Sequence, residues 1–295
     1  MIEVLRPGPL ATVQDAGRHG HAHLGVGHAG AVDADAYALA NRLAGNPYGA
    51  AAIELTLGGA ALRFRRPARF ALTGAPAPAA LDGRPAAYGR PEYAPRGAVL
   101  TLGAPDLGVR TYLAVGGGID VPPTLGSRST DTLSGLGPPV LAAGDLLPVG
   151  PAARSAAAAD WTPPRLPAAL ATVRATPGPR AAWLTDAAAA RLYAHPWEVT
   201  ADANRVGVRL RGPALDRTVT GELPSEGMVA GAVQLPASGQ PIVFLADHPT
   251  TGGYPVVAVV AEPDLPLVAQ ARPGQRLRFA AVPHPFPVPT ELRPA

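Results

Sequence analysis

The sequence predicts a mainly β fold with two β-rich subdomains and a few short helices. Short runs in which every second residue is apolar recur along the chain, which is the pattern of half-buried strands. Helix start signals are few. An Ala/Pro-rich stretch over residues 150–179 interrupts the pattern, as a linker or a surface crossover does.

The N-terminal subdomain is predicted over residues 1–150. Asp33 can cap a helix that runs through Leu43 and stops at Gly45. Alternating apolar residues predict three strands here, at Ile53, Leu55 and Leu57; at Phe70 and Leu72; and at Val109, Thr111, Leu113 and Val115.

The C-terminal subdomain is predicted over residues 180–295, after a linker or crossover at residues 151–179. Asp186 can cap a helix through Tyr193. Continuous apolar runs predict strands buried on both faces at residues 242–246 and 256–260. Alternating residues predict two more strands, at Val206, Val208 and Leu210 and at Leu277 and Phe279.

The charged residues limit the chemistry that this chain can perform. All 25 Lys+Arg residues are arginine, and the cysteine count is 0. The chain therefore cannot form a lysine Schiff base, use a thiolate nucleophile, place a Walker-type lysine on a phosphate or carry biotin covalently. Disulfides and cysteine zinc sites are excluded as well. The net charge is only +3 and the arginines are scattered, which argues against a nucleic-acid partner.

The N-terminal sequence MIEVLRPG lacks the cationic start and long apolar run of a secretory leader. No window approaches about 18 consecutive apolar residues, the length that a membrane helix needs. We therefore expect a soluble, cytoplasmic protein without a membrane partner.

Residues 116–131, GGGIDVPPTLGSRSTD, follow an apolar strand and have the composition of an anion-binding loop. Glycines allow a ligand to approach the backbone, and Ser127, Arg128, Ser129 and Thr130 offer donors for a carboxylate or phosphoryl group. Asp131 is expected to orient the arginine. The alternative is that the hydroxyls and an Arg-Asp pair only hold a long turn together.

Three further polar clusters lie at strand ends, and together the four predict a concave polar site for a urea-like, amide or carboxylate group. Glu226 and Asp247 are candidate general bases. Each cluster could instead be a turn, and TTGGYP could be a hairpin between two buried strands whose glycines supply positive φ. The three clusters contain Gln14, Asp15 and Arg18; Glu226, Gln234 and Gln240; and Asp247, Thr250, Thr251 and Tyr254.

Four histidines, His19, His21, His23 and His28, lie close together in the sequence. On a strand, His19, His21 and His23 would share one face and could bind zinc. No acidic residue lies among them, and Gly20 suggests an exposed loop, so we expect no metal site here.

Several segments together resemble the KipA-type, or allophanate hydrolase subunit 2, carboxyltransferase family. The segments follow one another over nearly the whole chain, and LGSRSTD and TTGGYP are the most specific of them. They are TVQDAGR, GVGHAGAVDADAYALANRLAGN, AAIELTLGG, YLAVGGGIDVPPTLGSRSTD, ELPSEGMVAGAVQLPASGQPIVFLADHPTTGGYP and DLPLVAQARPGQRLRF.

This resemblance implies a cyclophilin-like β-barrel architecture and a KipI-type partner that completes the site. For a short stand-alone member, it implies a subunit of an enzyme that uses ATP with Mg²⁺ to hydrolyse 5-oxoproline to glutamate, together with a LamB/YcsF-type protein. Such a subunit is expected to be inactive alone. Two alternatives remain open: a biotin-dependent carboxyltransferase subunit for urea or a related amide, and a non-enzymatic KipA-type antagonist of a KipI-type kinase inhibitor.

The resemblance also carries site residues onto matching positions. Asn204 stands where the family more often has Asp, so we expect a weakened charge pair at Arg205. The expected catalytic residues are Arg128, Asp131, Glu226 and Asp247. The expected substrate-binding residues are Asp15, Arg18, Asn41, Ser127, Ser129, Thr130, Gln234, Gln240, Thr250, Thr251, Gly252, Gly253 and Tyr254.

Overall fold

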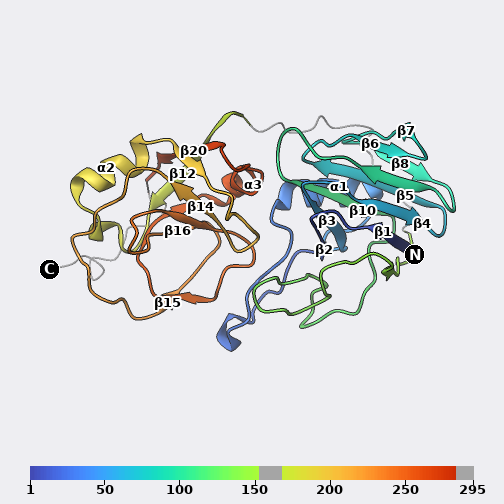
Figure 1. Cartoon of the computed structure of the whole chain (residues 1–295). Helices are drawn as coiled ribbons and strands as arrows, with labels where there is room; N and C mark the ends of the chain where they lie inside the picture. Colours follow the sequence, from blue (N-terminus) through green and yellow to red (C-terminus); the bar gives the residue numbers. More distant parts are fainter. Residues whose placement is uncertain (153–167, 284–295) are drawn as a thin grey trace. The chain divides into compact units, whose positions relative to one another are not determined.

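A computed structural model describes residues 1–152 and 168–283, which form two compact units (Figure 1). Unit 1 comprises Met1–His19 and Ala29–Pro167, and unit 2 comprises Gly20–His28 and Ala168–Ala295. Strands dominate both units, so the predicted mainly β class is confirmed. Over the described ranges, no helix has the length and apolar character needed to cross a membrane.

Unit 1 is built from two antiparallel sheets that share one core. The six-stranded sheet has the order β11-β1-β4-β9-β6-β7, and the five-stranded sheet has the order β2-β3-β10-β5-β8. The bounds are β1 Ile2–Arg6, β2 Leu10–Gln14, β3 Ala52–Thr56, β4 Ala61–Phe64, β5 Ala68–Gly74, β6 Ala79–Leu81, β7 Arg84–Pro85, β8 Pro91–Ala94, β9 Val99–Leu102, β10 Arg110–Val115 and β11 Leu146–Leu147.

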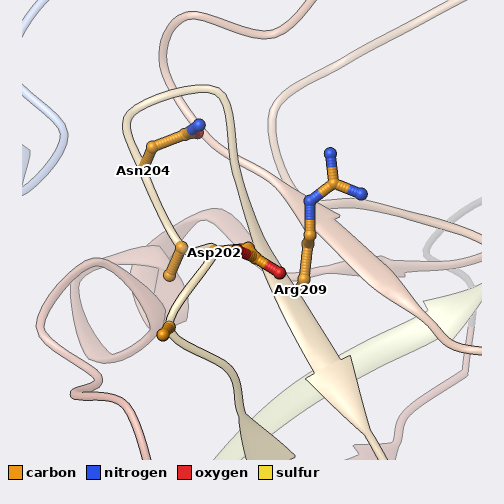
Figure 2. Close-up of a pocket in the computed structure, with 5 residues that line it drawn as sticks. Asp202, Asn204 and Arg209 are labelled. Carbon is orange, nitrogen blue, oxygen red and sulfur yellow. The ribbon is translucent and has the colours of Figure 1, made fainter.

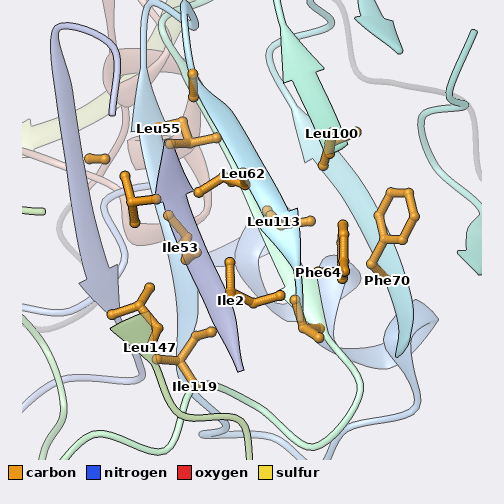
Figure 3. Close-up of a cluster of buried hydrophobic side chains, with 14 of the residues drawn as sticks. Ile2, Ile53, Leu55, Leu62, Phe64, Phe70, Leu100, Leu113, Ile119 and Leu147 are labelled. Atoms are coloured by element: carbon orange, nitrogen blue, oxygen red, sulfur yellow. The ribbon is translucent and has the colours of Figure 1, made fainter. Parts of the chain in front are cut away.

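The core of unit 1 takes side chains from both sheets. Ile2 and Leu62 come from the six-stranded sheet, and Ile53, Phe70 and Leu113 come from the five-stranded one; each is at most 1% exposed (Figure 3). Because alternate residues of a strand point to opposite faces, this shared core explains the period-two runs that predicted these strands.

Helix α1 (Ala34–Ala44) covers the outer face of the five-stranded sheet. Asp33 caps it by accepting a hydrogen bond from the Ala36 amide at 2.9 Å, and Gly45 ends it in the left-handed conformation, as the sequence predicted. Tyr37 and other α1 residues pack on Tyr112 and Ala114 of β10. Every residue of β10 is therefore buried, on both faces of the strand.

Unit 2 is a closed barrel of seven strands in the order β12-β19-β16-β17-β14-β13-β20. Its strands are β12 Leu170–Pro177, β13 Trp197–Val199, β14 Gly207–Arg211, β16 Ala232–Gln234, β17 Ile242–Phe244, β19 Val256–Val260 and β20 Arg276–Ala281. The first and last of these strands along the chain, β12 and β20, pair in parallel and close the barrel, whereas the other barrel pairs are antiparallel.

The remaining elements of unit 2 are short. They are helix α2 (Asp186–Ala194), helix α3 (Leu265–Ala269), the 3-10 turns η1 (Ala22–Leu24), η2 (Ala181–Trp183) and η3 (Glu262–Asp264), and a two-stranded ribbon of β15 (Glu226–Gly227) and β18 (Thr251–Gly252). The residue that caps α2 is Thr185, whose hydroxyl accepts from the Ala188 amide at 3.2 Å, and not Asp186.

The segment predicted as a linker, residues 151–179, falls partly outside the described residues. Its end, however, forms strand β12, where Ala171, Val173 and Ala175 are buried in alternation with exposed neighbours. The Ala/Pro-rich composition concealed this alternation, because alanine is a weak apolar signal.

Candidate functional site

In the polar loop of unit 1, the donors of residues 127–129 bond to the carboxylate of Asp15 from the same chain. Asp15 Oδ1 accepts hydrogen bonds from the hydroxyls of Ser127 and Ser129, both at 2.6 Å, and from the Gly17 amide at 2.8 Å. Its Oδ2 accepts from the Arg128 amide at 2.5 Å. Asp15 is 6% exposed, and both serines are 0% exposed. These buried groups therefore satisfy one another's hydrogen-bonding capacity.

Arg18 joins the same network. Its side chain is buried; its Nε donates to the Thr124 carbonyl at 3.2 Å, and its Nη2 donates to the Ser129 carbonyl. Thr130 is also buried: its amide donates to the Val13 carbonyl at 2.9 Å, which attaches the loop to the edge of β2. Arg18 and Thr130 thus hold the loop on the sheet.

Arg128 and Asp131 do not pair with each other, contrary to the sequence prediction. Arg128 Nη2 donates to Asp120 Oδ1 at 2.9 Å, and its Nε donates to the Val121 carbonyl at 2.7 Å. Asp131 Oδ1 instead accepts from the amides of Leu133 and Ser134, a local turn. Within residues 127–131, Arg128 alone reaches solvent, with 34% of its side chain exposed.

Asn41 lies on α1 and is 1% exposed. Its Nδ2 donates to the Ala50 carbonyl at 2.8 Å, and its Oδ1 accepts from Asn46 Nδ2 at 2.8 Å. These bonds hold the segment that follows α1 against the helix, so the role of Asn41 in the structure is to stabilise the fold.

In unit 2, the ribbon brings two of the predicted motifs together. Glu226 of LPSEGMV pairs with Gly252 of TTGGYP, and Gly227 pairs with Thr251. The Met228 amide also donates to the Thr250 carbonyl at 2.9 Å. The hairpin alternative is wrong, because β17 and β19 both pair with β16 and not with each other.

Glu226 forms a part-exposed ion pair with Arg180. Arg180 Nε lies 3.1 Å from Oε1 and 3.3 Å from Oε2 of Glu226, and Arg180 Nη2 also donates to Oε1. The hydrogen bond to Glu226 raises the pKa of Arg180 above its ordinary value. The guanidinium lies 5.6 Å from the ring centroid of Trp183. Sequence reasoning missed Arg180, because it directly follows the stretch interpreted as a linker.

Gly252 is needed for space and not for positive φ. A Cβ at this position would lie 2.7 Å from Gln234 Nε2 and 3.1 Å from Met228 Sδ, while its φ is not in the left-handed region. Gln234, on β16, donates through Nε2 to the Tyr254 carbonyl at 3.3 Å. Thr251, Gly253 and Tyr254 are exposed, Tyr254 by 49%.

Asp247 does not have the surroundings of a general base. It forms a two-point ion pair with Arg205, with Nε to Oδ2 at 2.9 Å and Nη2 to Oδ1 at 2.8 Å. The two side chains are 0% and 1% exposed. The charge pair of Arg205 is therefore strong, whereas Asn204 caps a turn by accepting from the amides of Val206 and Gly207. The pair fixes the start of the loop that leads to β18.

Gln240 is also structural. Its Oε1 accepts from the Gly212 amide at 2.9 Å, and its Nε2 donates to the Gly212 carbonyl at 3.0 Å. The side chain thus pairs with a backbone peptide as a neighbouring strand would.

The histidines do not alternate along a strand, the arrangement that would have placed His19, His21 and His23 on one face, because residues 22–24 form the turn η1. Within the ranges that the structure describes, no group of three or more His, Cys, Asp or Glu side chains could hold a metal ion. A surface hollow of about 530 Å³ lies at the turn between β13 and β14, where Asp202 and Asn204 face Arg209 (Figure 2). None of the predicted site residues lines it.

The exposed polar surface around the ribbon is therefore the candidate site. We call it the ribbon site and define it as Arg180, Glu226, Thr251 and Tyr254. It combines a carboxylate, a guanidinium, a hydroxyl and an aromatic ring on adjacent segments of one unit. Gln234 is 5% exposed and holds the Tyr254 backbone beneath this surface. Such groups can bind and orient a small polar molecule that carries a carboxylate and an amide.

Comparisons with known proteins agree with the mainly β architecture. Residues 24–281 match the family model described as carboxyltransferase domain, subdomain A and B. The chain is 42% identical to the 5-oxoprolinase C subunit of Escherichia coli, over 95% of this chain and 90% of that protein. It is 36% identical to the 5-oxoprolinase C subunit of Haemophilus influenzae, over 96% of this chain and 91% of that protein.

A solved structure of the K. lactis urea amidolyase superimposes with a TM-score of 0.90 at 30% sequence identity. The match covers 95% of this chain but 18% of that much longer chain. The fold and nearly the full length of the chain are thus shared with these proteins.

Proposed function

The chain belongs to the family of carboxyltransferase domains of subdomain A and B type, and on this premise we propose that it is the C subunit of an ATP-dependent 5-oxoprolinase. The observation that carries the proposal is the 42% identity to a 5-oxoprolinase C subunit, which extends over 90% of that protein. The proposed complex opens the cyclic amide of 5-oxoproline to give glutamate.

The ribbon site has the groups that this substrate requires. 5-Oxoproline carries a carboxylate, which a guanidinium such as Arg180 binds well, and a lactam whose N–H and C=O can pair with Glu226 and with Thr251. Tyr254 supplies an exposed aromatic wall beside them. Glu226 is the candidate that activates water or orients the lactam. Both carboxylates are paired with an arginine, but 29% of the Glu226 side chain is exposed, whereas that of Asp247 is 0% exposed.

The described residues do not fit Mg²⁺-ATP. Walker-type phosphate binding needs a lysine, and all 25 cationic residues are arginine. The helices α1 and α2 each carry an aspartate in their first turn, which repels phosphate. In the described ranges, no group of three or more His, Asp or Glu side chains could hold a metal ion. We therefore propose that the nucleotide binds to another subunit.

The proposed partners are a KipI-type subunit, which shares the active site, and a LamB/YcsF-type subunit. Relatives named as 5-oxoprolinase subunits belong by that name to an assembly of several chains. This chain is accordingly proposed to be inactive alone. A carboxyltransferase role toward urea is the second candidate, favoured by the similarity to urea amidolyase. A KipA-type role as an antagonist of a KipI-type inhibitor is the non-enzymatic alternative.

Reconstitution tests the proposal. Turnover of 5-oxoproline and ATP is measured with this chain and the KipI-type and LamB/YcsF-type proteins in every combination. We expect activity only when all three are present. Activity toward urea with added biotin carboxylase and biotin carrier, and none toward 5-oxoproline, would instead identify the carboxyltransferase role. Hydrolysis of 5-oxoproline by this chain alone would contradict the proposal that it is inactive without its partner subunits.

A further inference from the structure

The carboxylate of Glu226 already occupies the contact that a ligand carboxylate would make with Arg180. Arg180 donates through Nε to both carboxylate oxygens and through Nη2 to Oε1. Adjacent N–H groups of a guanidinium form the fork that binds a carboxylate at two points. Among the residues that the structure describes, Glu226 is the one acceptor of this side chain. A ligand carboxylate therefore competes with Glu226 for Arg180.

The pair is accessible to such a competitor. The side chains of Arg180 and Glu226 are 23% and 29% exposed. An ion pair exposed to this extent contributes little net free energy, so a second carboxylate can replace one partner. The Arg205–Asp247 pair of the same unit is the contrast, because its side chains are 1% and 0% exposed and a solute does not reach them.

The two partners differ in how firmly the fold holds them. The Arg180 amide donates to the Val256 carbonyl of β19 at 3.0 Å, and its carbonyl accepts from the Trp183 amide at 3.0 Å. The Trp183 ring also lies beside the guanidinium, 5.6 Å away at its centroid. Glu226 lies on the short ribbon, and none of residues 221–227 is buried. Because segments that bury little surface open most readily, Glu226 is the partner that moves when the pair separates.

We propose that Glu226 holds the position of the substrate carboxylate on Arg180 in the free chain, and that the carboxylate of 5-oxoproline displaces it. The released Glu226 then accepts a hydrogen bond from the lactam N–H. This inference rests on the proposed function. In 5-oxoproline the carboxylate is attached to the carbon next to the lactam nitrogen, so the two groups can reach two neighbouring side chains. A lactam without a carboxylate leaves Glu226 on Arg180, so the pair selects molecules that carry both groups.

Calorimetric titration of the reconstituted complex with 5-oxoproline, in the absence of ATP, tests the competition. Glu226→Gln weakens the bond to Arg180, while the amide oxygen of glutamine can still accept from the lactam N–H. The affinity for 5-oxoproline should therefore rise about three- to fivefold, although turnover is lost. An unchanged or lower affinity would overturn the inference, because a residue that only contacts the substrate weakens binding when it is replaced.

Turnover of 2-pyrrolidinone, the same lactam without the carboxylate, distinguishes displacement from simultaneous binding of both carboxylates to Arg180. The unsubstituted complex should act on it slowly, and acetate, which can take the place of Glu226 on Arg180, should raise the rate at least about tenfold. Arg180→Met releases Glu226 permanently. This variant should reach the higher rate with 2-pyrrolidinone without acetate, while its turnover of 5-oxoproline falls.

Arg211→Met is the matched control, because it removes the arginine of another exposed Arg-Glu pair, that with Glu198. It should leave the rates with both lactams unchanged. If neither acetate nor Arg180→Met raises the rate with 2-pyrrolidinone, the inference is overturned even when the titration agrees with it. The acetate experiment needs no variant, so it holds even where Arg180→Met fails to fold. If the unsubstituted complex neither binds nor hydrolyses 5-oxoproline, the proposed function fails, and this inference fails with it.

Discussion

The polar loops of the two units use the same kinds of residue but serve different purposes. In unit 1, Asp15, Ser127 and Ser129 are at most 6% exposed and bond to one another. In unit 2, Thr251 and Tyr254 are exposed beside the half-buried Glu226. Hydroxyl and amide donors in a glycine-rich loop can bond to a carboxylate, but their presence does not show whether that carboxylate belongs to a ligand or to the chain itself. In unit 1 the chain itself supplies the anion.

The largest effect is expected at the buried pair of unit 2, which supports the ribbon site from inside. Asp247→Ala leaves the Arg205 guanidinium buried without its carboxylate, so we expect a loss of about 3–5 kcal/mol in unfolding free energy, measured by urea denaturation. The double variant Arg205→Met/Asp247→Leu, which removes both charges, should recover most of this loss. A loss below about 1 kcal/mol for Asp247→Ala would contradict the burial of the pair.

Asp15→Asn tests whether the polar loop of unit 1 has a structural role. The substitution removes an accepting oxygen that faces hydroxyl and amide donors, so stability should fall by about 2–3 kcal/mol in urea denaturation. Asp120→Asn, at the exposed ion pair with Arg128, is the control and should cost less than about 1 kcal/mol. If Asp15→Asn keeps full stability yet loses activity, the loop is a ligand site after all.

Glu226→Gln should lower activity and leave stability nearly unchanged, the opposite of what we expect for Asp15→Asn. Removing the carboxylate should lower kcat/KM of the reconstituted complex about 100-fold, equivalent to about 2.7 kcal/mol, while the melting temperature of the isolated chain changes by only a few degrees. The control is Glu198→Gln, which alters another Arg-Glu pair, that of Arg211 with Glu198 at 2.5 Å. Equal turnover for both variants would remove Glu226 from the ribbon site.

Arg128→Ala should have the smallest effect. Its Nε and Nη2 already bond to Val121 and Asp120, so the geometry favours a role in holding the loop. We expect a stability loss below about 1 kcal/mol and turnover within about threefold of the unsubstituted complex. A decrease of about 30-fold or more, with an intact fold and intact assembly, would restore the substrate-binding role that the sequence suggested.

Local signals made much of the fold predictable. Asp33 and Gly45 define the ends of α1, and the alternation around Ile53 and Leu113 identifies strands, because capping and strand periodicity depend on nearby residues. Strand β12 was missed because its buried residues include Ala171 and Ala175, which resemble linker composition.

The site was less predictable, because partners distant in the sequence decide the role of each side chain. Asp131 and Asp120 are both close to Arg128 along the chain, and only the folded backbone shows that Asp120 is its partner. Likewise, the sequence offers Asp247 as a general base, and only the structure shows that Arg205 donates hydrogen bonds to both of its carboxylate oxygens. The family resemblance pointed to these positions, but it did not separate those that support the fold from those that face solvent.

The parallel pairing of β12 with β20 has a consequence for synthesis on the ribosome. Leu170 pairs with Arg276, so the barrel cannot close until nearly all of unit 2 has been translated. Until then, the partner edges of β12 and β13 are open to other chains, and such long-range pairing forms slowly. Unit 1 has an even longer pairing, Ile2 with Leu147, but it adds only the two-residue edge strand β11, so the rest of both sheets can form before it. Nascent unit 2 should therefore depend on chaperones during synthesis more than unit 1.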